Sequence, residues 1–209
     1  MSSLRSLKLA LNEITSEQSL EKLKNAILHS QLKELDLNSN NIGNNGIKQV
    51  ASALGSISTL EKLNLSNCNF TAKGALPLFQ ILAKNSRLKE LILDKNFLDG
   101  KRLRVLRDFI GNNNGLHYLS MNHCRLGEEG AYFISQGLTK NRKLRTLLLS
   151  NNNIFDEGLI RLGQTIGMSS LGLEHLDVSN NTLTDEGVID FAKNLAENRA
   201  LITLNLKQN

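Results

Sequence analysis

The sequence predicts an α/β solenoid built from about eight short units, and three observations lead to this fold class. A leucine pattern, L-x-x-L-x-L-x-x-(N/C), recurs at a nearly fixed spacing along all 209 residues. Within a unit, the apolar positions change from the alternating spacing of a strand to the i, i+3, i+4 spacing of a helix. Each strand is therefore followed by a helix, and successive strands have to run parallel. Self-similarity at such a period is the signature of stacked repeats.

The units follow one another at almost equal steps. Their first residues are Leu4, Leu32, Leu60, Leu88, Leu116, Leu144, Leu173 and Leu201. The step from Leu144 to Leu173 is one position longer than each of the others, which are all equal. One unit cannot bury its own apolar face, whereas several stacked units form a continuous core. We therefore expect residues 1–209 to form one domain.

The second unit illustrates the plan. Leu35 and Leu37 alternate with polar residues and predict a strand with one buried face. The segment 47–54 then carries Ile47, Val50 and Leu54 on one side and predicts an amphipathic helix.

The later units follow the same order. The inward strand positions are Leu63 and Leu65, Leu91 and Leu93, Leu119 and Met121, Leu147 and Leu149, Leu176 and Val178, and Leu204 and Leu206. The buried helix faces are expected to hold Leu76, Phe79 and Leu82; Leu103, Leu106 and Ile110; Phe133, Ile134 and Leu138; Leu159, Leu162 and Ile166; and Val188, Phe191 and Leu195. The single proline, Pro77, is expected in the first turn of its helix, where a missing N–H is tolerated.

The ninth position of every unit holds an asparagine or a cysteine. The column reads Asn12, Asn40, Cys68, Asn96, Cys124, Asn152, Asn181 and Asn209. An inward-facing asparagine amide can both donate to and accept from buried backbone groups of adjacent turns. We expect these side chains to stack into a structural ladder.

The two cysteines are interpreted as members of this ladder. Cys68 and Cys124 stand two repeats apart, so that their backbones should be roughly 10 Å apart, given strands about 4.8 Å apart. That separation exceeds the ~7 Å limit for a disulfide. Without a disulfide or an apolar signal segment, an intracellular and cytoplasmic location is expected.

The repeats resemble the ribonuclease-inhibitor type of leucine-rich repeat. The resemblance lies in LKELDLNSNNIGNNG, LEKLNLSNCNFTAKG, LHYLSMNHCRLGEEG, LRTLLLSNNNIFDEG and LEHLDVSNNTLTDEG. It implies a horseshoe with a concave parallel sheet and convex α-helices. Two units depart from the pattern: Gln18 and Arg102 stand where the helix-leading glycine belongs, with Gly100 displaced by two positions. We expect altered turns in both units.

Composition and residue placement argue against several functions. The net charge is +5, but the basic residues are not interleaved with aromatic ones, which argues against nucleic-acid binding. The four histidines, His29, His117, His123 and His175, do not converge with a nucleophile or with each other. We expect no enzyme activity, no metal, no cofactor and no membrane segment.

The concave face is the first candidate binding surface. Its outward positions are mostly polar, but Ile92, Tyr118 and Leu148 break this rule in three consecutive units. We expect them to be neighbours at the centre of the sheet, as in a binding hot spot. The expected polar surround consists of Glu90, Asp94, Asn122, Thr146 and His175.

The sequence thus predicts a non-catalytic protein-binding module or scaffold whose protein partner lies on the concave face or the ends. The chain starts and stops within the repeat pattern, so it is expected to be a fragment of a longer array or to be covered end-to-end by another chain. Members of the resembled family suggest alternatives: a regulator of a small GTPase, like the Ran GTPase-activating protein, or the sensor region of an immune receptor. A cytoskeletal or ciliary scaffold is a further alternative.

Overall fold

Strands and helices alternate along the whole described part of the chain. The computed structural model describes residues 3–15, 17–57, 59–167 and 172–209. Its elements are, in order, β1 (Ser6–Lys8), α1 (Glu17–Leu28), β2 (Glu34–Asp36), α2 (Gly43–Leu54), β3 (Lys62–Asn64), α3 (Ala72–Leu82), β4 (Glu90–Ile92), the 3-10 turn η1 (Gly100–Arg102), α4 (Arg104–Asn112), β5 (Tyr118–Ser120), α5 (Gly127–Leu138), β6 (Thr146–Leu148), α6 (Phe155–Ile166), β7 (His175–Asp177), α7 (Asp185–Asn194) and β8 (Thr203–Asn205). Each strand begins shortly after the first leucine of its unit.

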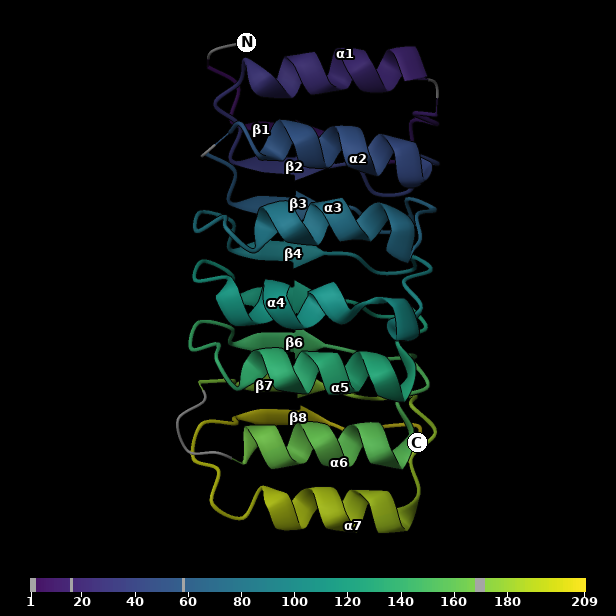
Figure 1. The fold of residues 1–209 in the computed structure, drawn as a ribbon, viewed down its shortest axis with the longest axis vertical. Helices are drawn as coiled ribbons and strands as arrows, with labels where there is room; N and C mark the ends of the chain where they lie inside the picture. Colours follow the sequence, from purple (N-terminus) through teal and green to yellow (C-terminus); the bar gives the residue numbers. More distant parts are fainter. Residues whose placement is uncertain (1–2, 16, 58, 168–171) are drawn as a thin grey trace.

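The eight strands form one parallel sheet in chain order. The register reproduces the repeat: Leu35 pairs with Leu63, and Leu147 pairs with Leu176 across the longer step. Figure 1 shows the helices stacked in front of the sheet, from α1 to α7. The predicted α/β solenoid is confirmed.

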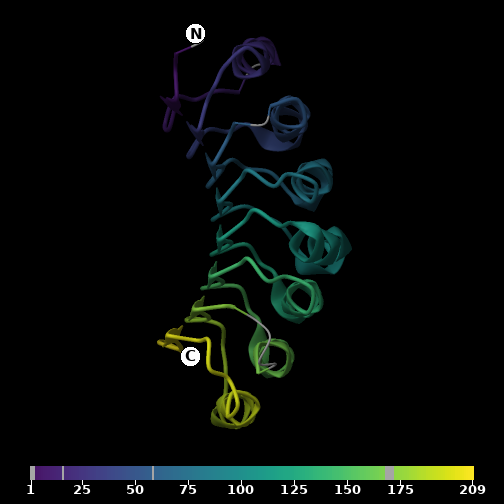
Figure 2. The ribbon, with the colours of Figure 1, turned by 90° about the vertical axis from the view of Figure 1, so that its left-hand side faces the viewer.

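The solenoid is curved, with the sheet on the inside of the curve. In Figure 2 the strands line the concave side and the helices line the convex side. Helices need about 10 Å of width, whereas paired strands lie only about 4.8 Å apart, so the helix layer has to spread. This difference explains why β8 lies level with α6 in both ribbon views, although it follows α7 in the chain.

The core lies between the sheet and the helices. The central strand leucines of the inner repeats, such as Leu35, Leu91 and Leu147, are fully buried. The equivalent residue of the last strand, Leu204, was predicted to face inward but is 37% exposed. It belongs to the last described repeat, and the described residues pack against only one side of that repeat.

A residue with left-handed backbone conformation follows every strand, three positions after the strand ends. The eighth position of all eight repeats has a positive φ between 51° and 61°, and none of these residues is a glycine: Leu11, Ser39, Asn67, Lys95, His123, Asn151, Asn180 and Gln208. This conformation is uncommon for residues with a Cβ. Here it turns the chain so that the following ladder residue points into the core.

Side chains of one repeat cap the helix of the next repeat. Asn44 Oδ1 accepts from the backbone N–H of Thr71 and of Gly74, and Asp156 Oδ1 accepts from the N–H of Thr184. A Cβ on Gly74 would lie 2.7 Å from Asn44 Oδ1. The helix-leading glycine therefore leaves room for a cap from the preceding repeat.

The fourth repeat has the altered turn that its displaced glycine predicts. The turn η1 replaces the first helical turn, and α4 begins only at Arg104. A Cβ on Gly100 would overlap the carbonyl oxygen of Leu126. Gly100 therefore lies directly against the entry to α5. In the first repeat, the altered turn expected near Gln18 includes Ser16, which lies outside the described residues.

Two predictions about α3 were wrong. Pro77 lies inside the helix, at its sixth residue, rather than in its first turn. Leu76, expected on the buried face, is 44% exposed, whereas Phe79 and Leu82 are fully buried. Phe79 stacks on Phe109 of α4, with ring centroids 4.9 Å apart.

Candidate functional site

The predicted hot-spot residues lie on adjacent central strands of the concave face. Strand register places Ser120 of β5 between Ile92 of β4 and Leu148 of β6. Tyr118 lies in the neighbouring row, paired with Glu90 on one side and Thr146 on the other. The three apolar side chains therefore surround a small residue and do not form one straight row.

These side chains are partly shielded from solvent. Ile92, Tyr118 and Leu148 are half-buried, and Ser120 is almost fully buried. Burial raises the pKa of the Tyr118 hydroxyl, and the nearby carboxylates of Asp94 and Glu90 raise it further. The tyrosine is therefore neutral at physiological pH and can donate or accept a hydrogen bond at the centre of the face.

A hydrogen-bonded network runs beside the apolar cluster. Asp94 Oδ1 accepts from Ser120 Oγ at 2.6 Å and from the backbone N–H of Asn122 at 2.8 Å. Asn122 Oδ1 accepts from the N–H of Ser150, and Ser179 Oγ donates to Ser150 Oγ. These bonds link four consecutive repeats and fix two members of the predicted polar surround, Asp94 and Asn122.

The remaining members of the predicted surround are also held by neighbours. Lys62 Nζ lies 2.9 Å from a carboxylate oxygen of Glu90. His175 Nδ1 lies 2.7 Å from Thr203 Oγ1. Thr146 is half-buried and pairs with Tyr118 and His175 in the register. All eight predicted binding residues thus lie on β4 to β7 or just after these strands.

The asparagine column bonds each turn to its neighbours. Asn96, which is fully buried, donates through Nδ2 to the carbonyls of Leu65 and Leu93 and accepts at Oδ1 from the N–H of Cys68. Asn40, Asn152 and Asn209 make the corresponding bonds in their repeats. Asn181 likewise accepts from the N–H of Asn152 and donates to the carbonyl of Leu149, but its second carbonyl partner is Ser179. Asn12, in the first repeat, donates to its own turn, at the carbonyl of Ala10.

The two cysteines occupy the same position and are free thiols. Cys68 Sγ lies 3.2 Å from the carbonyl oxygen of Leu37, and Cys124 Sγ lies 3.3 Å from that of Leu93. Burial raises the pKa of both thiols to about 12. They are therefore protonated at neutral pH and act as donors. Since the thiolate is the form that attacks electrophiles and binds metals, this burial leaves both cysteines unreactive.

A second asparagine column was missed by the sequence interpretation. Asn113 donates to the carbonyls of Leu82 and Asn85, and Asn141 donates to those of Ile110 and Asn113. These side chains lie where the helices return to the strands. The equal spacing of Asn85, Asn113 and Asn141, which matches the repeat, was the signal that could have identified them.

Within the described residues, no three His, Cys, Asp or Glu side chains come together in a way that could hold a metal ion. Among the described helices, none combines the length and apolar character that crossing a membrane requires.

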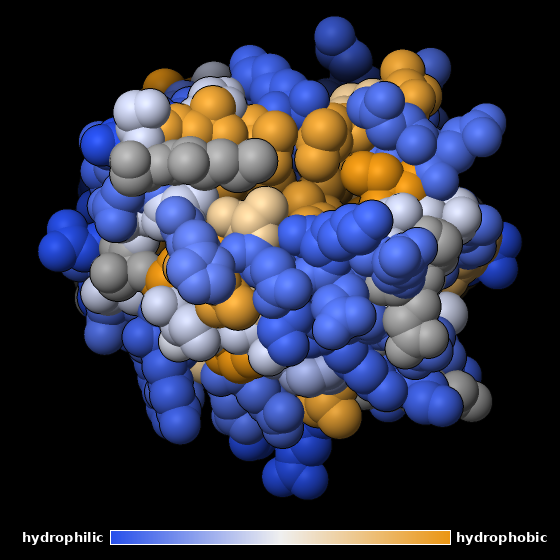
Figure 3. All heavy atoms as spheres, turned by 90° about the horizontal axis from the view of Figure 1, so that it is seen from above, coloured by the Kyte–Doolittle hydropathy of each residue, from blue (hydrophilic) through white to orange (hydrophobic). Residues whose placement is uncertain are grey.

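Apolar side chains are also exposed at the two ends of the described solenoid. Leu11 is 78% exposed at one end, and Ile202 is 70% exposed at the other. Figure 3 looks onto the end that carries β1 and α1, and a group of apolar atoms is visible between polar ones. Leu4, Leu7 and Leu9 are partly buried there.

The profile of the leucine-rich repeat family matches residues 1–17, 30–51, 56–79, 112–135, 140–163 and 173–192. The chain is 33% identical over 182 residues to a ribonuclease inhibitor of Sus scrofa, a match that covers 86% of this chain and 40% of that protein. It is 30% identical over 209 residues to NACHT, LRR and PYD domains-containing protein 14 of Mus musculus, covering 99% of this chain and 21% of that protein. The chain thus spans less than half the length of either relative. A solved internalin from Listeria monocytogenes shares the fold, with a TM-score of 0.56, 20% identity and coverage of 98% of this chain and 49% of that one.

Proposed function

Because this chain belongs to the leucine-rich repeat family, in its ribonuclease-inhibitor type, we propose that it is a non-catalytic module that binds a protein partner on its concave face. The observation that carries the proposal is the half-buried cluster of Ile92, Tyr118 and Leu148 around Ser120. Apolar and aromatic anchors inside a polar rim are the usual anatomy of a protein-binding hot spot.

The rigidity of the surrounding polar residues supports this proposal. Asp94 accepts from Ser120 and from the backbone N–H of Asn122, and Asn122 accepts from the backbone N–H of Ser150. The side chains of Asp94 and Asn122 therefore lose little conformational freedom on binding. Ordering flexible side chains is one of the costs of association. A pre-arranged rim therefore favours binding of a partner with a complementary surface.

The relatives support a protein as the partner. One is named for the inhibition of ribonuclease, an activity exerted on a protein. The chain covers only part of each relative, so partner identity does not transfer with the resemblance. An intracellular location is part of the proposal, on the ground that Cys68 and Cys124 are unpaired thiols. We further propose that residues 1–209 act as one domain, because one continuous sheet runs through them.

The experiment is co-purification with mass spectrometry from cells that express the protein. The Ile92→Asp/Leu148→Asp variant places two carboxylates in the cluster and should stay folded, because both side chains are only half-buried. Its partners should be lost. Ile189→Asp is the matched control, since Ile189 is a 54% exposed apolar residue on α7, outside the concave face.

The outcomes separate the candidate surfaces. Loss in the concave variant and retention in the control supports the proposal. If both variants keep their partners, the proposal is contradicted. The next candidate surfaces are then the apolar ends near Leu11 and Ile202, where an end-to-end contact with another chain would form. Accelerated GTP hydrolysis by an added Ran-type GTPase would instead favour the small-GTPase alternative. The immune-sensor alternative requires a longer protein and is tested by identifying the full gene product.

A further inference from the structure

A row of three hollows lies along the loops that lead from the strands to the helices. The first hollow has a volume of about 420 Å³ and includes Asn44 and Gln49 in its lining. The second, about 520 Å³, lies between the start of α3 and the loop before η1. The third, about 470 Å³, is lined by loop residues of the third to sixth repeats. Lys73 lines the first two hollows and Phe97 lines the last two, so the three are adjacent.

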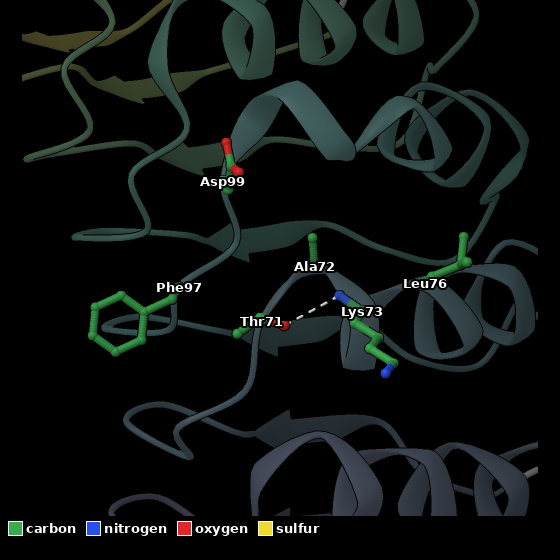
Figure 4. A pocket seen from close by; sticks show the side chains of 6 residues that line it. All are labelled: Thr71, Ala72, Lys73, Leu76, Phe97 and Asp99. Atoms are coloured by element: carbon green, nitrogen blue, oxygen red, sulfur yellow. Dashed lines mark hydrogen bonds between the residues drawn. The ribbon is translucent and has the colours of Figure 1, made fainter.

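The middle hollow exists because the fourth repeat departs from the others. Since η1 replaces the first turn of α4, the start of α3 faces a loop there and not a helix. Figure 4 shows Phe97 and Leu76 on opposite sides of Ala72 and Lys73, which lie at the start of α3. Leu76 and Phe97 are 44% and 45% exposed. Two large, partly exposed apolar side chains thus flank a single recess.

The charged groups around the hollows are mostly cationic. Lys73, Lys95 and Arg125 line them, and Asp99 is the only carboxylate among the described lining residues. Within the described ranges, no carboxylate lies within ion-pair distance of Lys73, Lys95 or Arg125. By contrast, Lys62 on the concave face is paired with Glu90. This edge therefore carries an excess of cationic charge.

The aromatic side chain is held in place by one of these cations. The guanidinium carbon of Arg125 lies 4.7 Å from the centre of the Phe97 ring. Such a cation–π contact orients both groups and leaves the guanidinium N–H groups able to donate outward. Phe97 and Arg125 together present an apolar surface beside a positive charge.

Amide groups complete the surface. Asn67 and Asn69, in the lining of the third hollow, each donate to a neighbouring side chain and keep a carbonyl oxygen on the surface. Amides of this kind match the N–H and C=O groups of an extended peptide backbone.

We propose that this edge binds an extended acidic peptide segment that inserts a large apolar side chain between Phe97 and Leu76. The row reaches from the second to the sixth repeat, which is at least roughly 20 Å at about 4.8 Å per strand. An extended chain covers that length with about six residues. This surface is separate from the concave cluster of Ile92, Tyr118 and Leu148, and the inference goes beyond the function proposed for that cluster.

A peptide fits this edge better than a nucleic acid. Single-stranded nucleic acids are bound by several aromatic side chains on which successive bases stack. Among the described lining residues, Phe97 is the only aromatic ring apart from the imidazole of His123, and Arg125 covers one of its faces. The recess between two apolar side chains suits a leucine or phenylalanine side chain.

The test is titration of the ¹⁵N-labelled protein with a probe peptide, followed by backbone amide chemical shifts. The probe is an acetylated and amidated octapeptide with two central leucines between three glutamates on each side. The peptide should change the amide chemical shifts of Lys73, Phe97 and Arg125. These changes should become smaller as the salt concentration is raised, because the charges involved are exposed and salt screens them. Two comparison peptides carry lysines for the glutamates or alanines for the leucines, and both should bind at least about tenfold more weakly.

Matched variants assign the binding to the proposed residues. Phe97→Ala and Arg125→Gln should each lower the affinity at least about tenfold. Phe155→Ala is the control for the first, since Phe155 is a 41% exposed phenylalanine outside the three hollows. Arg161→Gln is the control for the second, since Arg161 of α6 lies over the ring of Tyr132 at 6.0 Å, on the helix layer. Both controls should bind like the parent protein.

Several outcomes would overturn the proposal. One is the absence of shifts at low-millimolar acidic peptide, a range in which weak complexes are still detected by this method. Another is equal binding of the lysine peptide, or unchanged binding by Phe97→Ala. If an octamer of deoxythymidine bound more tightly than the acidic peptide, the ligand of this edge would be a nucleic acid and not a peptide. The Ile92→Asp/Leu148→Asp variant should still bind the peptide, because its substitutions lie outside the three hollows. The peptide titration and the co-purification experiment therefore test the two proposals separately.

Discussion

Asn44 caps a helix that does not belong to its own repeat: its Oδ1 lies 2.8 Å from the backbone nitrogen of Thr71, which belongs to the next repeat. The same oxygen accepts from Thr71 Oγ1 and from the N–H of Gly74. The four N–H groups at a helix start have no partner within the helix, so a cap of this kind stabilises α3. It also ties α2 to α3 at the edge of the stack.

Asn44→Ala should therefore lower the free energy of unfolding by about 1 kcal/mol, the usual effect of losing a helix cap. For a chain of this size, that corresponds to a decrease in Tm of about 2–4 °C. Asn45→Ala is the matched control, because the neighbouring Asn45 is exposed. Calorimetry of the three proteins checks the prediction, and equal Tm values for the two variants would contradict it.

The ladder predicts a larger effect at Asn96. Replacing Asn96 by alanine leaves the carbonyls of Leu65 and Leu93 and the N–H of Cys68 without their side-chain partner. Unsatisfied buried polar groups cost about 1–3 kcal/mol each, so a loss of about 3 kcal/mol or more is expected in urea unfolding. Asn96→Cys should recover part of this loss, because Cys68 and Cys124 hold the equivalent positions and their sulfur atoms face backbone carbonyls. A cysteine variant no more stable than the alanine variant would argue against a ladder role for the thiols.

Gly100 and Gly55 should respond oppositely to alanine. A Cβ on Gly100 would overlap backbone atoms of Leu126 and Gly130, which cannot move aside without disturbing α5. A Cβ on Gly55 would have its nearest neighbour at 3.5 Å, and the backbone there is right-handed helical. Gly55→Ala should raise stability by about 0.4–1 kcal/mol through the unfolded state, whereas Gly100→Ala should lower it by more than that. Thermal unfolding of both variants tests this prediction. If Gly100→Ala raised the stability, the η1 turn would not be tightly packed against α5.

The repeat period carries most of what the sequence predicts about the fold. It placed Leu35 and Leu63 in the core and Asn40 and Asn96 at the turn, because each position recurs with the same environment. It did not reveal the cap from Asn44 to Thr71, which joins residues that no local pattern connects. It also gave no sign of the left-handed conformation at Ser39 or Lys95, since neither residue type is specific for it.

The candidate surfaces were predictable to different degrees. Counting positions placed Ile92, Tyr118 and Leu148 on the concave face, but only the register shows that Ser120 separates Ile92 from Leu148. The recess beside Phe97 was not predicted. It depends on Leu76 being exposed and on α4 starting late, and both follow from how the fourth repeat packs rather than from the periodicity of α3.

The buried thiols make stability depend on pH in the alkaline range. In the folded chain, burial raises the pKa of Cys68 and Cys124 to about 12, whereas an exposed thiol titrates near 9. The unfolded chain therefore loses these two protons first as the pH rises. The stabilisation is complete below pH about 9 and is lost progressively between about 9 and 12, because the unfolded state binds fewer protons there.

The contribution of the thiols can be isolated with Cys68→Asn/Cys124→Asn, which places the residue of the other ladder positions at both sites. Between pH 8 and pH 10 the parent protein should lose about 2 to 3 kcal/mol more unfolding free energy than this variant, since each unit of pKa difference corresponds to about 1.4 kcal/mol per thiol. The other titratable groups are the same in both proteins, so their contributions to the change in unfolding free energy largely cancel. Urea unfolding at both pH values gives the result. Parallel losses in the two proteins would show that the thiols ionise as readily in the folded chain as in the unfolded one, and that they are not the buried donors that the ladder requires.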